Sequence, residues 1–466
     1  MANKWQEHCL GELGSFKNGA NFNKNSYGHK YPIVSVKNLF RGRFVTTDGL
    51  DALKEGAISK VDEYYIEKGD LVFARSSVKR DGAGQVAIVR DIPDNCIFSG
   101  FTIRFRLFDK SRVNPMFLLY LFKSPEYREL FTRIATGTTI SNLSQKILSD
   151  IKVNLPSKSA QDLIVKQIDD LDTKTELNYQ INQTLELMAQ VLFKSWFVDF
   201  DPVIDKALND GVEVSDFPAQ LQAKAKLRIN FRNSEDYRPL PNEILNLFPS
   251  EFVNSRIGWV PKGWQVSNID ETCSHIIDHR GKTPKKLGGD WAEEGFSAIS
   301  AKNVKGNQIV RPETIRYVDE ALYRKWMKVP LQPKDIIMTS EAPMGEMFFL
   351  ADKADYLLSQ RLYGMRADEE KTTGEYLNYW LQTVIARADL EGRATGTTVT
   401  GIRQVELKKV TVLLPDLAIS NKFSELAGQY LLQKELNNNQ RTSLEETRDY
   451  LLPNLITGKV QLGKVS

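Results

Sequence analysis

The sequence predicts a mixed α+β protein with two similar α/β domains, each followed by a long helix, the two helices pairing as an antiparallel coiled coil. Three observations support this fold class. The 466-residue chain repeats itself once over a long interval, each copy begins with short β-rich segments around one helix, and each copy ends in a heptad pattern of apolar residues. A duplication of this kind also predicts an approximate two-fold relation between the halves.

The duplication is visible as motifs that recur 259 residues apart. Trp5-Gln6 recurs as Trp264-Gln265, the Thr-Gly-Thr-Thr run at 136–139 recurs at 395–398, and Leu155-Pro156 recurs as Leu414-Pro415. Lys37-Asn38 recurs as Lys302-Asn303 at a spacing of 265, so the loops between the shared motifs differ in length. A period this long indicates two domains rather than a solenoid of short repeats.

Each copy starts with about 155 residues of mixed composition. In the first copy, β-branched and aromatic residues bounded by Gly, Pro, Asn or Asp predict strands at 31–39, 70–74, 85–90 and 101–108. Asn114-Pro115 is typical of a helix start, and apolar residues at helical spacing predict one helix over 116–134. Its counterpart is expected to begin near Thr373.

A heptad seam follows each domain. Positions seven apart are occupied by Ile164, Leu171, Asn178, Leu185 and Leu192 in the first copy, and by Phe423, Tyr430, Asn437, Leu444 and Leu451 in the second. A helix of about 37 residues is roughly 55 Å long, which exceeds what one domain core needs. We expect Asn178 and Asn437 to meet near the centre of the pair and to fix its register. The alternative is that each helix packs only across its own domain.

The predicted boundaries follow from these patterns. They are a first domain at 1–157, a first long helix at 158–200, an irregular connector at 201–262 that contains six prolines, a second domain at 263–417, and a second long helix with the C-terminal tail at 418–466.

Composition limits the functional classes. There are 62 Lys+Arg against 59 Asp+Glu, a net charge of +3, which argues against a uniformly basic coat or an acidic tail. Three widely spaced cysteines argue against a disulfide framework. The N-terminus lacks the apolar stretch of a signal peptide, and no apolar run approaches the ~20 residues of a membrane helix. We therefore expect a soluble cytoplasmic protein without a membrane partner.

Motifs for catalysis are weak. Gly281-Lys282-Thr283 lacks the glycine that a P-loop requires five residues earlier, where Ile276 stands. His275 and His279 have the spacing of a helical metal pair but no evident third ligand. No glycine-rich turn between a strand and a helix suggests an S-adenosylmethionine or dinucleotide pocket. We therefore predict no catalytic residues, no metal and no cofactor in this chain.

Basic and polar residues instead cluster in corresponding loops of both domains, which predicts a localised phosphate-binding face. We expect Lys79, Arg80, Lys282 and Lys285 to contact the phosphates of a nucleic acid. Expected nearer the base edges are Lys37, Asn38, Arg75, Lys302, Asn303 and Arg361. The candidate set is completed by Ser76, Thr138, Arg280, Ser340 and Thr397.

Taken together, these motifs resemble the specificity (S) subunit of type I restriction-modification systems. The resemblance covers essentially the whole chain. It is carried by the domain–helix–domain–helix duplication, Gly69–Val72 and Lys334–Ile337, the Thr-Gly-Thr-Thr loops, Lys194–Phe200 and Leu451–Lys459. The second copy departs from the first where Ser340–Pro343 replaces Arg75-Ser76-Ser77, so the two domains should not read the same bases.

The resemblance implies a subunit without catalysis of its own. Each α/β domain would be a target recognition domain for half of a bipartite double-stranded DNA sequence, and the helices would dock two methyltransferase subunits. Adenine methylation with S-adenosylmethionine would belong to those partners, and ATP- and Mg-dependent translocation and cleavage would belong to motor-nuclease subunits. The alternative is a two-domain scaffold or peptide-binding protein assembled through its coiled coil, which a salt titration of DNA binding would distinguish. An enzyme with a dispersed site is a third hypothesis.

Overall fold

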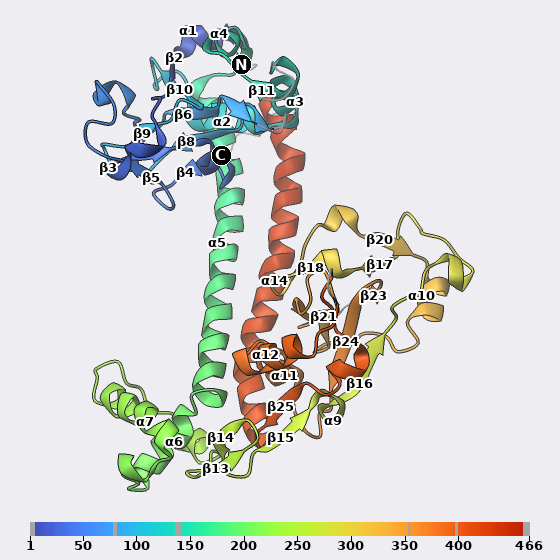
Figure 1. The fold of residues 1–466 in the computed structure, drawn as a ribbon. Helices are drawn as coiled ribbons and strands as arrows, with labels where there is room; N and C mark the ends of the chain where they lie inside the picture. Colours follow the sequence, from blue (N-terminus) through green and yellow to red (C-terminus); the bar gives the residue numbers. More distant parts are fainter. Residues whose placement is uncertain (1–4, 78–81, 136–140, 353–354, 397–398, 460–466) are drawn as a thin grey trace. The chain divides into compact units, whose positions relative to one another are not determined.

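A computed structural model describes residues 5–77, 82–135, 141–352, 355–396 and 399–459. The chain forms two compact units, residues 1–177 with 440–466 and residues 178–439. Each contains one α/β domain and part of both long helices (Figure 1). The mixed α+β class and the internal duplication are therefore confirmed.

The first domain is built on a five-stranded sheet in the order β2-β10-β6-β8-β4, beside a three-stranded sheet in the order β5-β3-β9. The strands are β1 (Gln6–Cys9), β2 (Gly14–Asn18), β3 (Tyr27–Val34), β4 (Phe44–Val45), β5 (Asp51–Leu53), β6 (Leu71–Ala74), β7 (Ser76–Ser77), β8 (Val86–Val89), β9 (Ile97–Phe98), β10 (Thr102–Leu107), β11 (Ser141–Asn142) and β12 (Lys152–Leu155). The first strand, β1, pairs antiparallel with the last, β12, which closes the domain on itself.

The predicted helix over 116–134 is two helices, α2 (Pro115–Lys123) and α3 (Pro125–Ile134). Ser124 between them has extended backbone with ψ of 152°. Pro125 has no N–H to continue the hydrogen bonds of α2 and disfavours helical backbone at the preceding residue, so the helix stops and restarts. The Asn114 side chain accepts a hydrogen bond from the N–H of Met116, the cap that the sequence predicted. The domain also contains two short helices, α1 (Leu10–Leu13) and α4 (Gln145–Ser149).

The second domain repeats this plan. Its strands are β15 (Gln265–Asn268), β16 (Cys273–Asp278), β17 (Phe296–Ile299), β18 (Val304–Lys305), β19 (Gln308–Ile309), β20 (Arg316–Val318), β21 (Ile336–Thr339), β22 (Met347–Phe349), β23 (Tyr356–Leu358), β24 (Leu362–Ala367) and β25 (Thr411–Leu414). Its helices are α9 (Ile269–Thr272), α10 (Glu320–Trp326), α11 (Gly374–Trp380), α12 (Val384–Gly392) and α13 (Gln404–Leu407). The sheet order β16-β24-β21-β22 matches β2-β10-β6-β8, and β15 pairs with β25 as β1 does with β12.

A buried ion pair is repeated in both domains. Asp70 is fully buried, and its two carboxylate oxygens accept hydrogen bonds of 2.8 and 2.7 Å from Nε and Nη2 of Arg106. Asp335 is equally buried and accepts two bonds of 2.8 Å from the same atoms of Arg366. These bidentate pairs fix β10 against β6 and β24 against β21.

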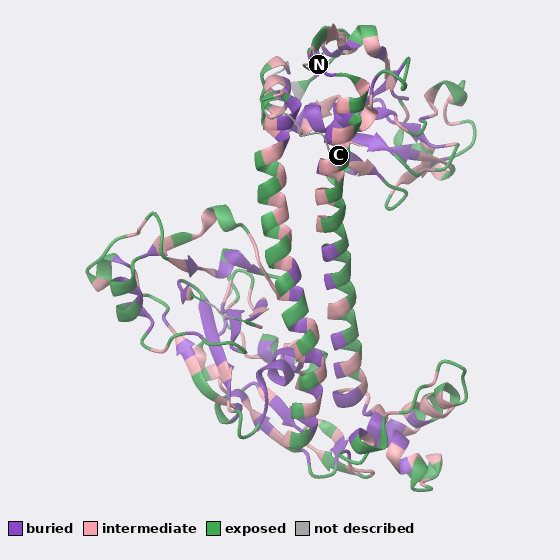
Figure 2. Ribbon diagram, turned by 180° about the vertical axis from the view of Figure 1, so that it is seen from behind, coloured by how far each residue is buried: buried purple, intermediate pink, exposed green. Residues whose placement is uncertain are grey.

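The long helices are α5 (Lys158–Phe197) and α14 (Leu417–Ile456). Each has a buried face and an exposed face (Figure 2). In the first unit, Ile164 and Ile168 of α5 share the domain core with Leu452 and Leu455 of α14. In the second unit the ends are exchanged, and the core takes in the end of α5 and the start of α14. The helices are therefore antiparallel and serve both functions proposed for them, pairing with each other and packing on the domains.

The buried asparagines confirm the antiparallel direction but not the predicted partner. Asn437 donates to Oδ1 of Asn182 at 2.8 Å, and Asn182 donates to Oδ1 of Asn438 at 2.9 Å. Asn182 lies one helical turn along α5 from the predicted Asn178, which is also buried. One turn further, Glu186 pairs with Lys434. Contacts between residues 182 and 437 and between 186 and 434 require helices that run in opposite directions.

Replacing both Asn182 and Asn437 by leucine should raise the melting temperature, because a buried polar pair gives way to apolar packing. The single variant Asn437→Leu should instead lower stability by about 1–3 kcal/mol, because it leaves part of the buried Asn182 amide without its partner. Thermal denaturation of the three proteins checks this. Equal shifts for the single and double variants would show that the pair has no energetic coupling.

The connector that the sequence predicts as irregular contains three helices and a β-hairpin. It forms α6 (Asp201–Asn209), α7 (Ala219–Arg232) and α8 (Asn242–Leu245), followed by the hairpin of β13 (Phe252–Ser255) and β14 (Gly258–Pro261). Buried Asp205 of α6 bonds both Nε and Nη2 of Arg228 on α7, at 2.9 and 2.6 Å. Pro202, Pro218 and Pro241 lie at helix starts and Pro261 ends β14, so these prolines are compatible with regular structure.

Candidate nucleic-acid interface

In each domain, four loops lie close together at one end of the strands of the main sheet. Because β10 is antiparallel to both β2 and β6, the ends of β2 and β6 lie beside the start of β10. The end of β3 joins them, since the N–H of Ser99 donates to the carbonyl of Val34. We call these segments the loop edge: 19–20, 35–40, 75–77 and 99–101 in the first domain, and 279–280, 300–303, 340–342 and 359–361 in the second.

The loop edge of the second domain contains a cationic hollow of about 280 Å³. Lys302, Arg316 and Arg361 line it, and none of the lining residues described by the structure is acidic. The guanidinium of Arg316 lies over the ring of Trp291, 3.8 Å from its centroid. Nε of Arg361 lies 2.8 Å from Oε1 of Glu341, and Arg361 keeps 52 % of its side chain exposed. Guanidinium groups held in this way can bind phosphates or guanine edges.

Sequence reasoning found Lys302 and Arg361 but missed Arg316 and Trp291. Neither residue belongs to a motif shared by the two copies. Arg316 begins β20 and Trp291 lies in the loop before β17, so the chain folds back to bring them together. An arginine and a tryptophan 25 residues apart carry no pattern that would have predicted their contact.

Three other predicted cations of the second domain do not line the hollow, and they differ in the contacts they make within the protein. Arg280 lies 4.4 Å from the ring centroid of Tyr363 and bonds Asp278 at 2.8 Å, and that hydrogen bond raises the pKa of Arg280. Lys282 donates to the carbonyl of Trp326 at 2.8 Å, and partial burial lowers the pKa of Lys282. Lys285 is exposed in the 3-10 helix Lys285–Leu287. Lys285 therefore best fits the predicted phosphate role.

In the first domain the predicted residues Lys37, Arg75 and Ser76 also lie on the loop edge. Nζ of Lys37 bonds Asp51 at 2.8 Å with half of the lysine side chain exposed. Arg75 is half-buried and donates to the carbonyl of Gly100 at 3.2 Å, and Ser76 donates to Asn142 at 2.6 Å. The candidates Lys79, Arg80, Thr138 and Thr397 lie outside the described residues.

Two predicted base contacts, Asn38 and Asn303, have structural roles instead. Asn38 is buried, and its Oδ1 accepts bonds from the N–H and hydroxyl of Ser35. Asn303 is fully buried and makes the same two bonds with Ser300, and it also donates to Val310 and Thr314. Both amides therefore brace the loop that presents Lys37 or Lys302, which explains why Lys-Asn recurs. The prediction that these asparagines approach bases is corrected.

Ser340 is corrected for a similar reason. It is only 2 % exposed, and its N–H and carbonyl bond the backbones of Arg361 and Ile402. Its position shapes the turn beside Arg361 rather than offering a hydroxyl to a ligand.

Comparison with known proteins assigns the family. The model of the type I restriction modification DNA specificity domain matches twice, at residues 2–187 and 261–446. The chain belongs to the type I restriction-modification specificity subunits. The HindI specificity subunit of Haemophilus influenzae is 27 % identical, over 98 % of this chain and 99 % of its own length. The putative MjaX specificity subunit of Methanocaldococcus jannaschii is 21 % identical over 97 % and 92 % of the two chains.

A solved specificity subunit shares the fold. The crystal structure of the type I S subunit from M. genitalium matches with a TM-score of 0.58 and 13 % identity, over 97 % of this chain and 96 % of that one. The two matches to the family model each span one α/β domain and continue into its long helix. The duplication of this specificity subunit is thus the duplication of its DNA specificity domain.

No helix among the described residues is long and apolar enough to cross a membrane. Within the same residues, no group of three or more His, Cys, Asp and Glu side chains is arranged to hold a metal ion.

Proposed function

We propose that this specificity subunit reads a bipartite double-stranded DNA sequence, one half with each loop edge. The observation that carries the proposal is the repetition of the loop edge, with Lys37 and Arg75 on one copy and Lys302, Arg316 and Arg361 on the other. Each 40-residue helix is roughly 60 Å long, which exceeds the roughly 34 Å of one DNA turn. Helices of that length could separate two readers on one face of the duplex.

We further propose that the long helices dock two methyltransferase subunits. On α5, Ile181, Met188 and Val191 recur at helical spacing and are 36, 46 and 57 % exposed. On α14, Leu432 and Leu436 are 42 and 49 % exposed. Contiguous exposed apolar side chains on a helix are typical of protein interfaces. These side chains support docking through helices rather than through the loop edges.

In this proposal the chain has no catalytic residue, and chemistry belongs to the partners. S-adenosylmethionine would be bound by the methyltransferase subunits, and ATP and Mg²⁺ by motor-nuclease subunits docked through them. A cytoplasmic location belongs to the same proposal, supported by cysteines Cys9, Cys96 and Cys273, which form no disulfide.

Exchange of residues 1–157 for the first domain of another specificity subunit tests the proposal. β1 and β12 close the domain within these residues, so the exchange should preserve folding when the donor domain keeps apolar residues against Ile168 of α5 and Leu455 of α14. Adenine methylation mapped in cells that express the hybrid with its methyltransferase subunits should show one altered half-site and one unchanged half-site. Two altered half-sites would refute independent reading, and an unchanged sequence would favour the scaffold alternative.

A further inference from the structure

The loop edge of the first domain presents an exposed aromatic ring. Phe101 directly precedes β10 and is 66 % exposed, although phenylalanine is usually buried. Its carbonyl accepts a 2.9 Å bond from the N–H of Arg75, which places it beside that cation. A second exposed ring, that of Phe40 at 53 %, lies in the neighbouring loop of the same edge.

The turn that presents Phe101 is tightly held. The N–H of Gly100 donates to the carbonyl of Ala20 at 2.7 Å. A Cβ atom at Gly100 would lie only 2.1 Å from Oδ1 of Asn21, so no larger residue fits without a shift. Arg75 adds a side-chain bond to the carbonyl of Gly100. The exposed ring therefore projects from a fixed backbone rather than from a loose loop.

The corresponding position in the second domain is Arg361. The N–H of Ser340 donates to the carbonyl of Arg361 at 2.8 Å, the same bond that joins Arg75 to Phe101. Ala74 is paired with Thr102 and Thr339 with Leu362, which confirms the equivalence. The two domains thus place a phenyl ring and a guanidinium at the same point of the same edge.

These side chains match different features of the major groove. The C5-methyl group of thymine is the apolar feature on a base-pair edge, whereas guanine offers two acceptors to an arginine. Resting on the function proposed above, we propose that Phe101 contacts a thymine methyl group in the half-site read by the first domain. Arg361 contacts guanine at the equivalent position of the other half-site.

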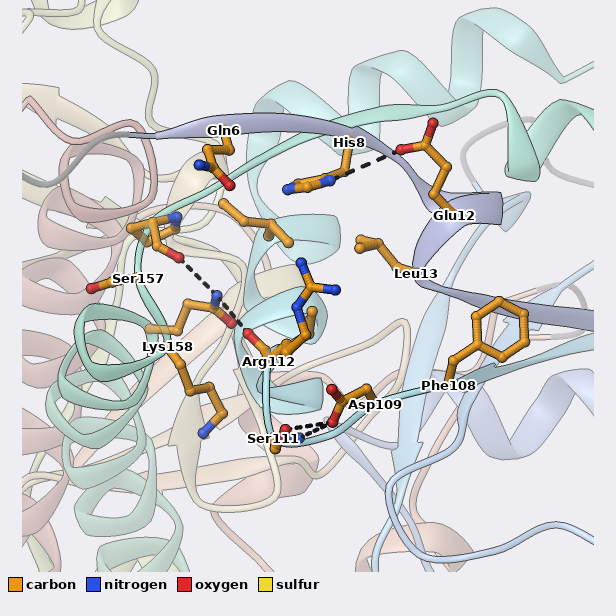
Figure 3. Close-up of a pocket in the computed structure, with 14 residues that line it drawn as sticks. Gln6, His8, Glu12, Leu13, Phe108, Asp109, Ser111, Arg112, Ser157 and Lys158 are labelled. Carbon is orange, nitrogen blue, oxygen red and sulfur yellow. Dashed lines mark hydrogen bonds and ion pairs between the residues drawn. The ribbon is translucent and has the colours of Figure 1, made fainter.

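A matched control lies on the same strand. Phe108 directly follows β10 and is 69 % exposed, so it resembles Phe101 in residue type and exposure. It lies at the opposite end of that strand, away from the loop edge. Figure 3 shows Phe108 beside Leu13 and Asp109 at a separate pocket. Phe108→Ala should therefore leave DNA recognition unchanged.

The test uses the specificity subunit co-expressed with its methyltransferase subunits. The target is first mapped from methylated adenines, and the half-site that exchange of residues 1–157 alters is assigned to the first domain. Each thymine of that half-site is then replaced by uracil, which removes only the methyl group. Binding of the wild-type complex should weaken on the order of four- to tenfold at one such position, the effect of one buried methyl group. The Phe101→Ala complex should bind thymine and uracil at that position equally.

Three results would overturn the proposal. They are a first half-site without thymine, equal binding of thymine and uracil by the wild-type complex at every position, and undiminished uracil sensitivity of the Phe101→Ala complex. Weaker binding by the Phe101→Ala complex, together with a wild-type complex that binds thymine and uracil equally, would identify the ring as a wedge that stacks on bases. Failure of the wild-type complex to prefer any DNA sequence would instead refute the function on which the proposal rests.

Discussion

Arg106→Met should destabilise the first domain by about 3–5 kcal/mol, because it leaves the fully buried carboxylate of Asp70 without its charged partner. The hydrogen bond with Asp70 raises the pKa of Arg106, as expected of a guanidinium that is held charged. Arg366→Met should have the same effect on the second domain through Asp335. Urea denaturation followed by limited proteolysis would show which domain opens first.

Glu67→Gln is the control for this prediction. Glu67 also bonds Arg106, at 2.6 Å, but it is 61 % exposed, so its loss should cost less than about 1 kcal/mol. Similar destabilisation by Arg106→Met and Glu67→Gln would show that the burial of Asp70 is not what makes the pair important.

Arg361→Ala should cost about 1–3 kcal/mol of binding to the target and should relax one base position in the second half-site. The Arg361 side chain is half-exposed in the cationic hollow. Among the described residues, Glu341 is its one ion-pair partner. DNA binding by the complex with its methyltransferase subunits, measured on target and random duplexes across a salt series, would separate the two effects. The loss should be larger on the target than on random DNA.

Lys285→Ala provides the comparison. An exposed lysine that neutralises one phosphate should weaken binding to all sequences about equally and should reduce the salt slope by about one. If Arg361→Ala also weakened target and random DNA to the same degree, Arg361 would be a phosphate contact and not a base contact.

The largest features of this protein could be predicted from its sequence. The duplication, the two long helices and the helix cap at Asn114 depend on local periodicity or on motifs that recur at fixed spacing. Such patterns are visible because each residue's environment is set by neighbours a few positions away. For the same reason, Lys302 and Arg361 could be predicted as candidate site residues from charge and loop position.

The rest depended on contacts between residues far apart in the sequence. Asn38 and Asn303 recur in the two copies as binding residues would, and only their burial shows that they brace loops instead. Asn437 pairs with Asn182 because the side chains of two antiparallel helices set the register, and a heptad pattern leaves that choice open by a turn.

Arg316 lies over the ring of Trp291 because the fold of the second domain brings these two distant residues together. The sequence by itself determined the repeated units and the length of the helices, since these follow from local backbone preferences. Which side chains line each loop edge was decided by the tertiary structure alone, because packing determines which side chains remain exposed there.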